Sequence, residues 1–269
     1  MQRRVTELYS YRELLKNLVV RDLKVRYKNS ILGILWSLLN PLLMTLVFTI
    51  VFTLMIPGGG QENYPVFFMC GFLPWTFFST SVSGATGSIV DSAGLIKKVY
   101  FPREILPIAE VLANLVNFLV AMLVLFGMIL VFQIKLTPAV LMLPVIILAQ
   151  VMFFTGMALF LSTAIVFYRV SLHILDVVLQ AWFFLSPVFY PITILPVSQE
   201  LLGMTVNIQQ WARRLNPMAS LVASYREVLY WGVPTGWDFF LRTFLTCAIV
   251  LVVGFMVFYR FSRLFGEEA

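Results

Sequence analysis

The chain has 269 residues, of which 60% are hydrophobic and only 12% are charged, and its mean hydropathy is +0.91. Soluble domains are closer to half apolar and one quarter charged, so this composition excludes an ordinary soluble enzyme, a disordered chain and a secreted disulfide scaffold. It predicts an all-α integral membrane protein, in which five or six spans of roughly 20–25 residues use up the chain. The net charge of +6 comes from basic residues at the ends of apolar runs, which is typical of membrane orientation rather than nucleic-acid binding.

The N-terminal residues 1–30 carry eight Lys or Arg, and their apolar side chains recur at helical spacing. Leu14 and Leu18 fall on one face of this helix, although Asp22 and Arg26 intrude on the same face. A basic amphipathic helix of this kind lies in the membrane interface. We therefore expect an interfacial helix over 1–30, the alternative being a solvated basic tail.

Six apolar segments are long enough to cross a bilayer. The predicted spans are 31–56, 64–90, 105–132, 139–167, 174–194 and 237–259. Pro41 should kink the first span, and Gly71 with Pro74 should break the second, whose Ser, Thr and Gly residues over 79–88 would allow close helix approach. The two halves of 198–231 are each too short to span, so we expect short re-entrant or surface-lying helices there.

The orientation follows from the distribution of basic residues. With the N-terminus inside, fourteen of the 19 Lys and Arg lie on the cytoplasmic side and five lie outside. The positive-inside rule therefore predicts six spans with both termini in the cytoplasm, a cytoplasmic loop at 91–104 and an external connection over 195–236.

The sequence offers little for catalysis on this chain. No P-loop motif occurs, because Gly58–Gly60 is followed by Gln-Glu rather than Lys-Ser, so ATP hydrolysis by the usual P-loop is excluded. One histidine and two distant cysteines do not match a metal-ligand spacing. His173 and Asp176 could form an acid–base pair, but no nucleophile or paired carboxylate accompanies them, which favours a polar cap at the start of the fifth span.

Charged residues within the predicted spans are few. Glu110, Asp176 and Arg242 all lie within reach of an interface, and none lies near a span centre. A carrier coupled to protons or ions usually needs an ionisable relay at the midplane, so this pattern favours an energy source on another chain.

Aromatic residues and one polar loop are the remaining candidates for function. The 25 Phe, 10 Tyr and 6 Trp form an ordinary interfacial belt or, in part, a surface on which sugar rings stack. The loop 91–104 carries apolar residues on the cytoplasmic side, so it either docks a partner or rests on the lipid headgroups.

Four motifs resemble those of a known family. They are RDLKVRYKNSILGILWSLLNP at 21–41, GFLPWTFF at 71–78, LIKKVYFPREILP at 95–107 and LNPM at 215–218. With them the chain resembles, over essentially its whole length, the transmembrane permease subunit of type-two ABC exporters of O-antigen, capsular polysaccharide or teichoic acid. The six spans and cytoplasmic termini of that family agree with the count above.

The resemblance implies a homodimer in the bacterial cytoplasmic membrane that binds two ATPase subunits, with ATP and Mg²⁺ held by those partners and no cofactor on this chain. The cargo would be an undecaprenyl-linked glycan or polyol-phosphate polymer, with 198–231 forming external gate helices. The coupling helix that contacts the ATPase would lie within 91–104 and use Leu95, Ile96, Lys97, Lys98, Val99, Tyr100, Phe101, Arg103 and Glu104.

The same resemblance points to residues along the path of the polymer. An aromatic-lined channel at the dimer interface would use Trp36, Trp75, Phe78, Trp182, Phe183 and Tyr190. The pyrophosphate of the lipid carrier would be attracted by Arg21, Lys24, Arg26 and Lys28, although topology and headgroup binding also explain these basic residues.

Three alternatives remain open from the sequence. A drug or small-lipid exporter of the same superfamily would share the architecture. A membrane-embedded transferase acting on lipid-linked sugars would need a catalytic carboxylate such as Asp176 or Glu110. A passive channel would transport without an ATPase.

Overall fold

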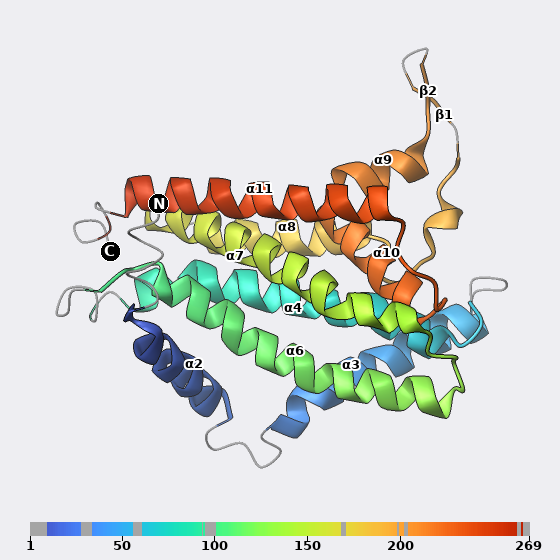
Figure 1. The fold of residues 1–269 in the computed structure, drawn as a ribbon, viewed down its shortest axis with the longest axis horizontal. Helices are drawn as coiled ribbons and strands as arrows, with labels where there is room; N and C mark the ends of the chain where they lie inside the picture. The colour runs from blue at the N-terminus through green and yellow to red at the C-terminus, as the bar shows by residue number, and fades with distance from the viewer. Residues whose placement is uncertain are drawn as a thin grey trace.

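The computed structural model describes residues 10–27, 34–55, 61–92, 94, 101–167, 171–197, 199–201, 204–262 and 265. Five helical segments are long and apolar enough to cross a membrane. They are formed by α3 (Ile34–Thr49) with the π-helical η1 (Ile50–Met55), α4 (Tyr64–Asp91), α6 (Ile105–Val131), η2 (Pro138–Met142) with α7 (Leu143–Phe167), and α11 (Trp237–Phe261). Figure 1 shows these helices packed side by side as one bundle.

All but one of the shorter elements lie at the two ends of this bundle, and the helix over 171–185 runs alongside the long helices (Figure 1). The shorter elements are α2 (Arg12–Tyr27), α8 (Ser171–Leu185), η3 (Ile192–Ile194), the antiparallel strands β1 (Gln199–Leu201) and β2 (Met204–Val206), α9 (Ile208–Leu215) and α10 (Pro217–Leu229). In Figure 1, α2 lies at the lower left, and the β1–β2 hairpin projects at the upper right. We call these two ends the α2 end and the hairpin end.

Two predictions about helix continuity were wrong. The second predicted span is a single helix, α4, which runs through Gly71 and Pro74 to Asp91 without a break. The fifth predicted span, 174–194, is helical only to Leu185, because Pro187 cannot donate to the helix and the chain turns before η3.

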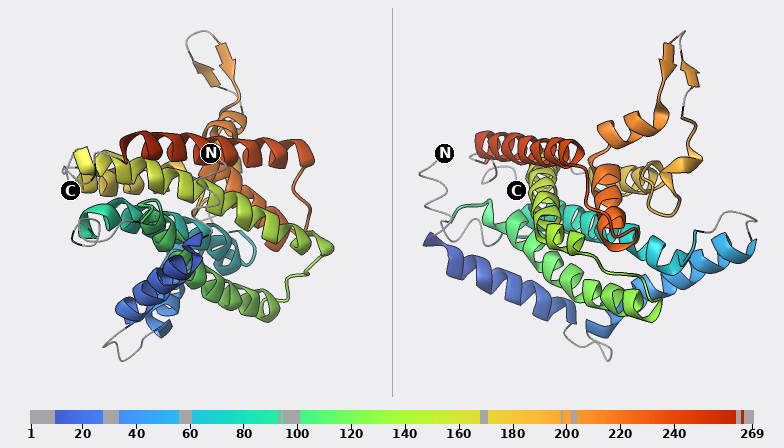
Figure 2. Two further views of the ribbon diagram at one scale, coloured as in Figure 1. Left: turned by 60° about the vertical axis from the view of Figure 1, so that its left-hand side comes forward. Right: turned by 45° about the vertical axis from the view of Figure 1, so that its right-hand side comes forward.

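The interior of the bundle is organised around α4. Most of its side chains are buried, since it contacts α3, α6, α7, α8 and α10. On the other side of the bundle, α7 and α11 approach until their backbones touch. A Cβ atom on Gly156 would lie 2.6 Å from the backbone of Val250 and Leu251, so only glycine fits there. Both views of Figure 2 show α7 beside α11, with the hairpin standing clear of the helices.

A second apolar cluster closes the α2 end. It joins one residue of α2 to the ends of α4, α6, α7 and α11 and contains Leu18, Ile89, Phe101, Ile105, Leu106, Ala109, Leu159, Ile165, Val166, Phe258 and Phe265. The apolar face of α2 therefore packs on protein at Leu18, while Lys24 on the same helix is exposed.

Candidate functional site

An open groove of about 510 Å³ lies between α3, α4 and α8. Its apolar lining consists of Met44, Phe48, Phe72, Trp75, Leu179, Phe183 and Phe184. Its polar lining consists of Ser79, Thr80, Ser83, Asp176 and Gln180. On α4 these side chains recur every three or four residues, and the same spacing relates those on α8, so each helix presents one continuous stripe to the groove.

The groove has an aromatic half and a polar half. The rings of Trp75 and Phe183 lie 5.5 Å apart, and Tyr64 at the start of α4 donates to the carbonyl of Phe189 after the end of α8, so the two helices run in opposite directions. Antiparallel packing then brings Ser83 of α4 and Asp176 of α8 to the same part of the groove, toward the α2 end. The aromatic side chains, including Phe72 and the exposed Phe184, lie toward the hairpin end.

The aromatic half is held in place by further ring contacts. Phe48 of α3 stacks on Phe68 of α4 at 4.6 Å and contacts Phe183 of α8 at 6.4 Å. Phe68 in turn stacks on Phe72 at 4.9 Å. Ring pairs at these separations favour one relative placement of the helices that carry them, so the aromatic wall is preformed.

The polar half presents hydroxyl, carboxylate and amide groups. The hydroxyl of Thr80 donates to the carbonyl oxygen of Thr76 at 2.7 Å, and that of Ser79 donates to the same carbonyl at 3.2 Å. Each hydroxyl oxygen keeps its lone pairs for a bound molecule. Asp176 and Gln180 are exposed on the facing side of the groove.

The structure separates the six predicted channel residues. Trp75 and Phe183 line the groove. Phe78 is fully buried and stacks on Phe153 at 5.6 Å, so it lies behind the lining of this groove. Because Phe78 is three residues from Trp75 on one helix, only knowledge of the neighbouring helices could separate the two.

The other predicted channel residues are not part of the groove lining or lie outside the described part of the chain. Trp182 is half-buried, its ring lies 5.1 Å from that of Phe78, and its indole N–H donates to the side-chain oxygen of Asn216 at 3.0 Å. Tyr190 lies in the turn after α8 and donates to the carbonyl of Phe184. The side chain of Trp36 lies outside the described residues.

A buried arginine organises the hairpin end. Arg226 of α10 is 3% exposed, and its guanidinium donates to the carbonyl oxygens of Pro187 and Val188 at 2.5 Å each. It also donates to the carbonyl of Phe67 and lies 3.7 Å from the centre of that residue's ring. Burial lowers the pKa of Arg226 to about 9, so the group is still charged at neutral pH.

Gly71 makes room for this arginine. A Cβ atom at position 71 would lie 2.7 Å from the carbonyl oxygen of Val188 and 2.9 Å from Nη2 of Arg226. The glycine of the GFLPWTFF motif therefore lets the turn after α8 and the guanidinium of α10 reach α4. Sequence reasoning treated Arg226 only as one of the five external basic residues and missed this role.

Asn216 of the LNPM motif connects α10 to α8. Its side-chain oxygen accepts from the backbone N–H groups of Met218 and Ala219, which caps α10. Its amide nitrogen donates to the hydroxyl of Ser186 at 2.9 Å. Together with the bond from Trp182, these contacts fix the start of α10 on the end of α8.

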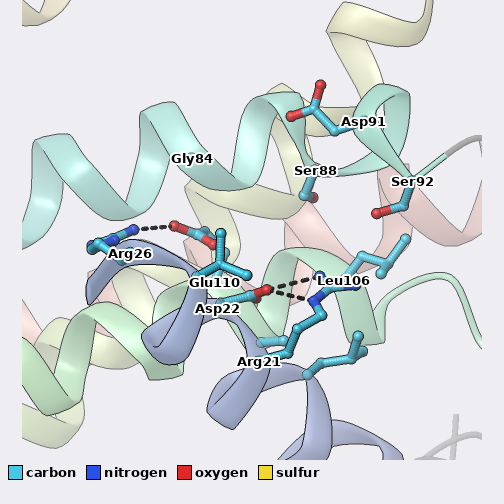
Figure 3. Close-up of a pocket in the computed structure, with 12 residues that line it drawn as sticks. Arg21, Asp22, Arg26, Gly84, Ser88, Asp91, Ser92, Leu106 and Glu110 are labelled. Carbon is cyan, nitrogen blue, oxygen red and sulfur yellow. Dashed lines mark hydrogen bonds and ion pairs between the residues drawn. The ribbon is translucent and has the colours of Figure 1, made fainter. Parts of the chain in front are cut away.

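A second cavity, of about 580 Å³, lies at the α2 end (Figure 3). There Arg26 of α2 donates to the carboxylate of Glu110 at 2.8 Å and to the side-chain oxygen of Asn114 at 2.6 Å. Gly84 of α4 leaves space for that carboxylate, since a Cβ atom there would lie 2.8 Å from Cδ of Glu110. Arg26, which interrupts the apolar face of the N-terminal helix, and Glu110, which lies within a predicted span, therefore neutralise each other's charge.

The predicted pyrophosphate-binding residues differ in their partners. Arg26 is held by α6, whereas Arg21 contacts only its neighbour Asp22 at 2.7 Å among the ion pairs of the described residues. Lys24 is exposed. Lys28 lies outside the described residues.

The predicted coupling residues lie partly in the described chain. Phe101 is buried in the cluster at the α2 end, so the expectation that it is exposed was wrong. Arg103 donates to the carbonyl of Ser262 at the end of α11, and Glu104 is buried at the start of α6. The other predicted coupling residues, 95–100, lie outside the described part of the chain.

Comparison with known proteins places these features in a family. A family model described as ABC-2 type transporter matches residues 13–230. The O-antigen export system permease protein RfbA of Myxococcus xanthus is 39% identical over 231 residues, covering 86% of this chain and 85% of that protein. Two Klebsiella pneumoniae proteins of the same name are 29% and 30% identical over 260 residues, covering 95% of this chain and 94% of each relative. This chain therefore belongs to the ABC-2 type transporter family.

Proposed function

We propose that this chain is the permease subunit of an ATP-driven exporter that moves a lipid-linked polysaccharide across the bacterial cytoplasmic membrane. The groove between α3, α4 and α8 carries the proposal, because it combines preformed aromatic rings with hydroxyl and amide groups. Aromatic faces suit sugar rings, and hydroxyl and amide groups suit sugar hydroxyls. The names of the relatives from Myxococcus and Klebsiella support the same cargo.

The proposed assembly is a homodimer with two ATPase subunits, which bind ATP and Mg²⁺. The groove is open on one side, and a second copy facing it across α3 and α8 would enclose a passage. We place the α2 end and both termini in the cytoplasm, in agreement with the distribution of basic residues. In this arrangement α8 with the turn after it provides the sixth crossing, and α9 and α10 gate the external end.

The coupling proposal follows the contacts around 91–104. Leu95, Ile96, Lys97, Lys98, Val99 and Tyr100 would face the ATPase, while the following residues anchor the segment in the permease. Phe101 packs in the cluster at the α2 end, and Arg103 reaches the end of α11. A push on this segment would therefore act on α6 and α11 together.

The docking proposal has its own test. Replacing Val99 and Tyr100 by Ser, with Phe101 left intact, should detach the ATPase or uncouple its hydrolysis from transport, because the change is confined to residues that we propose bind the ATPase. Copurification of the two subunits and the ratio of ATP hydrolysed to polymer moved are the measurements. Wild-type copurification together with a wild-type ratio would contradict docking through this segment.

The lipid carrier would enter near the α2 end. Arg21 and Lys24 are the residues we propose to attract its pyrophosphate, with Lys28 beside them in the sequence. Arg26 is less available, because Glu110 and Asn114 already bind it. Replacing Arg21 and Lys24 by Gln should raise the concentration of lipid-linked substrate needed for half-maximal transport.

The decisive experiment is reconstitution with the cognate ATPase in proteoliposomes that contain a lipid-linked glycan. We expect ATP-dependent appearance of the glycan on the far side and none with the permease alone. Transport by the permease alone would favour a passive channel. Chemical change of the glycan that depends on Asp176 or Glu110 would favour a transferase instead.

A further inference from the structure

The charge of the groove bears on which polymers it admits. Among the described residues that line it, Asp176 is the only ionisable one, and no Lys or Arg is present. Arg21 and Arg26 of α2 line the other cavity instead, where the carboxylates of Asp22 and Glu110 bind them. The described lining of the groove therefore contains one acidic side chain and no basic one.

The hydrogen-bonding groups point the same way. The hydroxyls of Ser79 and Thr80 donate to their own helix and offer lone pairs to the groove, and a carboxylate at position 176 only accepts. Sugar hydroxyls can donate to all of these oxygens. A phosphodiester or carboxylate on a polymer brings only acceptors and a like charge, so Asp176 would repel it, and only donors such as the Gln180 amide and the Ser83 hydroxyl could bind it.

We propose that the groove selects uncharged glycans and discriminates against polyanionic polymers such as polyol phosphates, with Asp176 as the residue that determines this specificity. The inference rests on the proposed export function and narrows its cargo. In the proposed homodimer two copies of Asp176 would face one passage, which would double the repulsion. The aromatic half, with Trp75 and Phe183, would contact the faces of uncharged sugars whatever the order of sugars in the polymer.

The test compares two cargoes on the same lipid carrier and of matched length: an uncharged hexose polymer and poly(glycerol phosphate). The intact permease–ATPase complex is reconstituted, and both export and polymer-stimulated ATP hydrolysis are measured. We expect the wild type to export the uncharged polymer at least about tenfold faster than poly(glycerol phosphate). A tenfold ratio of rates requires only a small difference in interaction free energy between the two polymers. This comparison needs no variant, so a folding defect cannot obscure it.

Variants then assign the preference to one side chain. Asp176→Asn should reduce the preference several-fold by raising transport of the polyanion, and Asp176→Glu should retain it. Asp238→Asn is the matched control, because Asp238 is an exposed acidic residue at the start of α11, away from the groove lining. It should leave the preference unchanged.

Equal export of both polymers by the wild type would overturn the inference while leaving the export function intact. So would a preference that Asp176→Asn does not alter. Failure of an assembled complex to export either polymer would overturn the export function, and the specificity proposal would fall with it.

Discussion

The two ends of the bundle hold an arginine in different ways. At the hairpin end Arg226 is buried and bonded to main-chain carbonyls of the turn after α8 and of α4. At the α2 end Arg26 is partly exposed and paired with the flexible side chain of Glu110. Main-chain acceptors cannot move without refolding, whereas a side-chain carboxylate can rotate away. The hairpin end is therefore a fixed joint, whereas the contact at the α2 end can open and close.

Removing the guanidinium at the fixed end should have the largest effect. Arg226→Met leaves several buried carbonyls without a donor and should lower the free energy of unfolding by at least about 3 kcal/mol. The thermal midpoint of the detergent-purified protein measures this. Arg242→Met is the control, since that guanidinium is partly exposed and lies 5.3 Å from the ring of Phe239. Equal thermal midpoints for Arg226→Met and Arg242→Met would contradict our description of the hairpin end as a fixed joint.

Two glycines allow a matched comparison of the ends. Gly71→Ala would press a methyl group against the carbonyl of Val188, which is part of the main chain, and should cost about 1–3 kcal/mol. Gly84→Ala would meet only the side chain of Glu110, which can rotate, so its cost should be smaller. Thermal midpoints measured side by side decide this. The reverse order would show that the α2 end is the more rigid one.

Breaking the ion pair at the α2 end should affect coupling more than stability. Glu110→Gln removes the carboxylate that binds Arg26, and a partly exposed pair contributes only about 0–1 kcal/mol. We expect a thermal midpoint near that of the wild type and several-fold less transport for each ATP hydrolysed. Exchanging the charges, with Arg26→Glu and Glu110→Arg combined, should recover part of the coupling. A midpoint that falls as far as that of Arg226→Met would contradict the contrast.

The smallest effect on transport should come from Trp182→Phe, which keeps a ring but removes the donor to Asn216. We expect a loss of about 0.5–1.5 kcal/mol in stability and an unchanged export rate, because Trp182 faces the core and α10. Phe183→Ala, next along the same helix, should slow export at similar stability because Phe183 lines the groove. Slower export by Trp182→Phe than by Phe183→Ala would reverse our assignment of the two faces.

Hydropathy predicted the long apolar helices well, because the helix length that a bilayer requires does not depend on the neighbouring helices. Five predicted spans correspond to candidate membrane spans, but the fifth segment ends as a helix at Leu185 because of Pro187. The direction in which each aromatic residue points depends on the neighbouring helices, so Trp75 and Phe78 could not be told apart. The polar residues Ser79 and Ser83 were interpreted only as small residues, although both line the groove.

The binding partners of the charged residues could not be predicted from the sequence either. Glu110 and Arg26 are 84 positions apart, and no local pattern joins them. Nothing in the sequence around Arg226 distinguishes it from a surface arginine. The carbonyl groups that it binds belong to the turn after α8, which is distant in the sequence. The coupling motif at 95–107 indicated a docking segment, but packing buries its Phe101.

The glycine contact between α7 and α11 has a consequence for how the groove could widen. These helices meet backbone to backbone at Gly156 and Gly254, with no layer of side chains on which one could slide past the other. The two helices therefore form a single rigid unit packed behind α4. Dilation of the passage then falls to the opposite wall, where α3 ends in a π-helical stretch and α8 gives way to a proline turn.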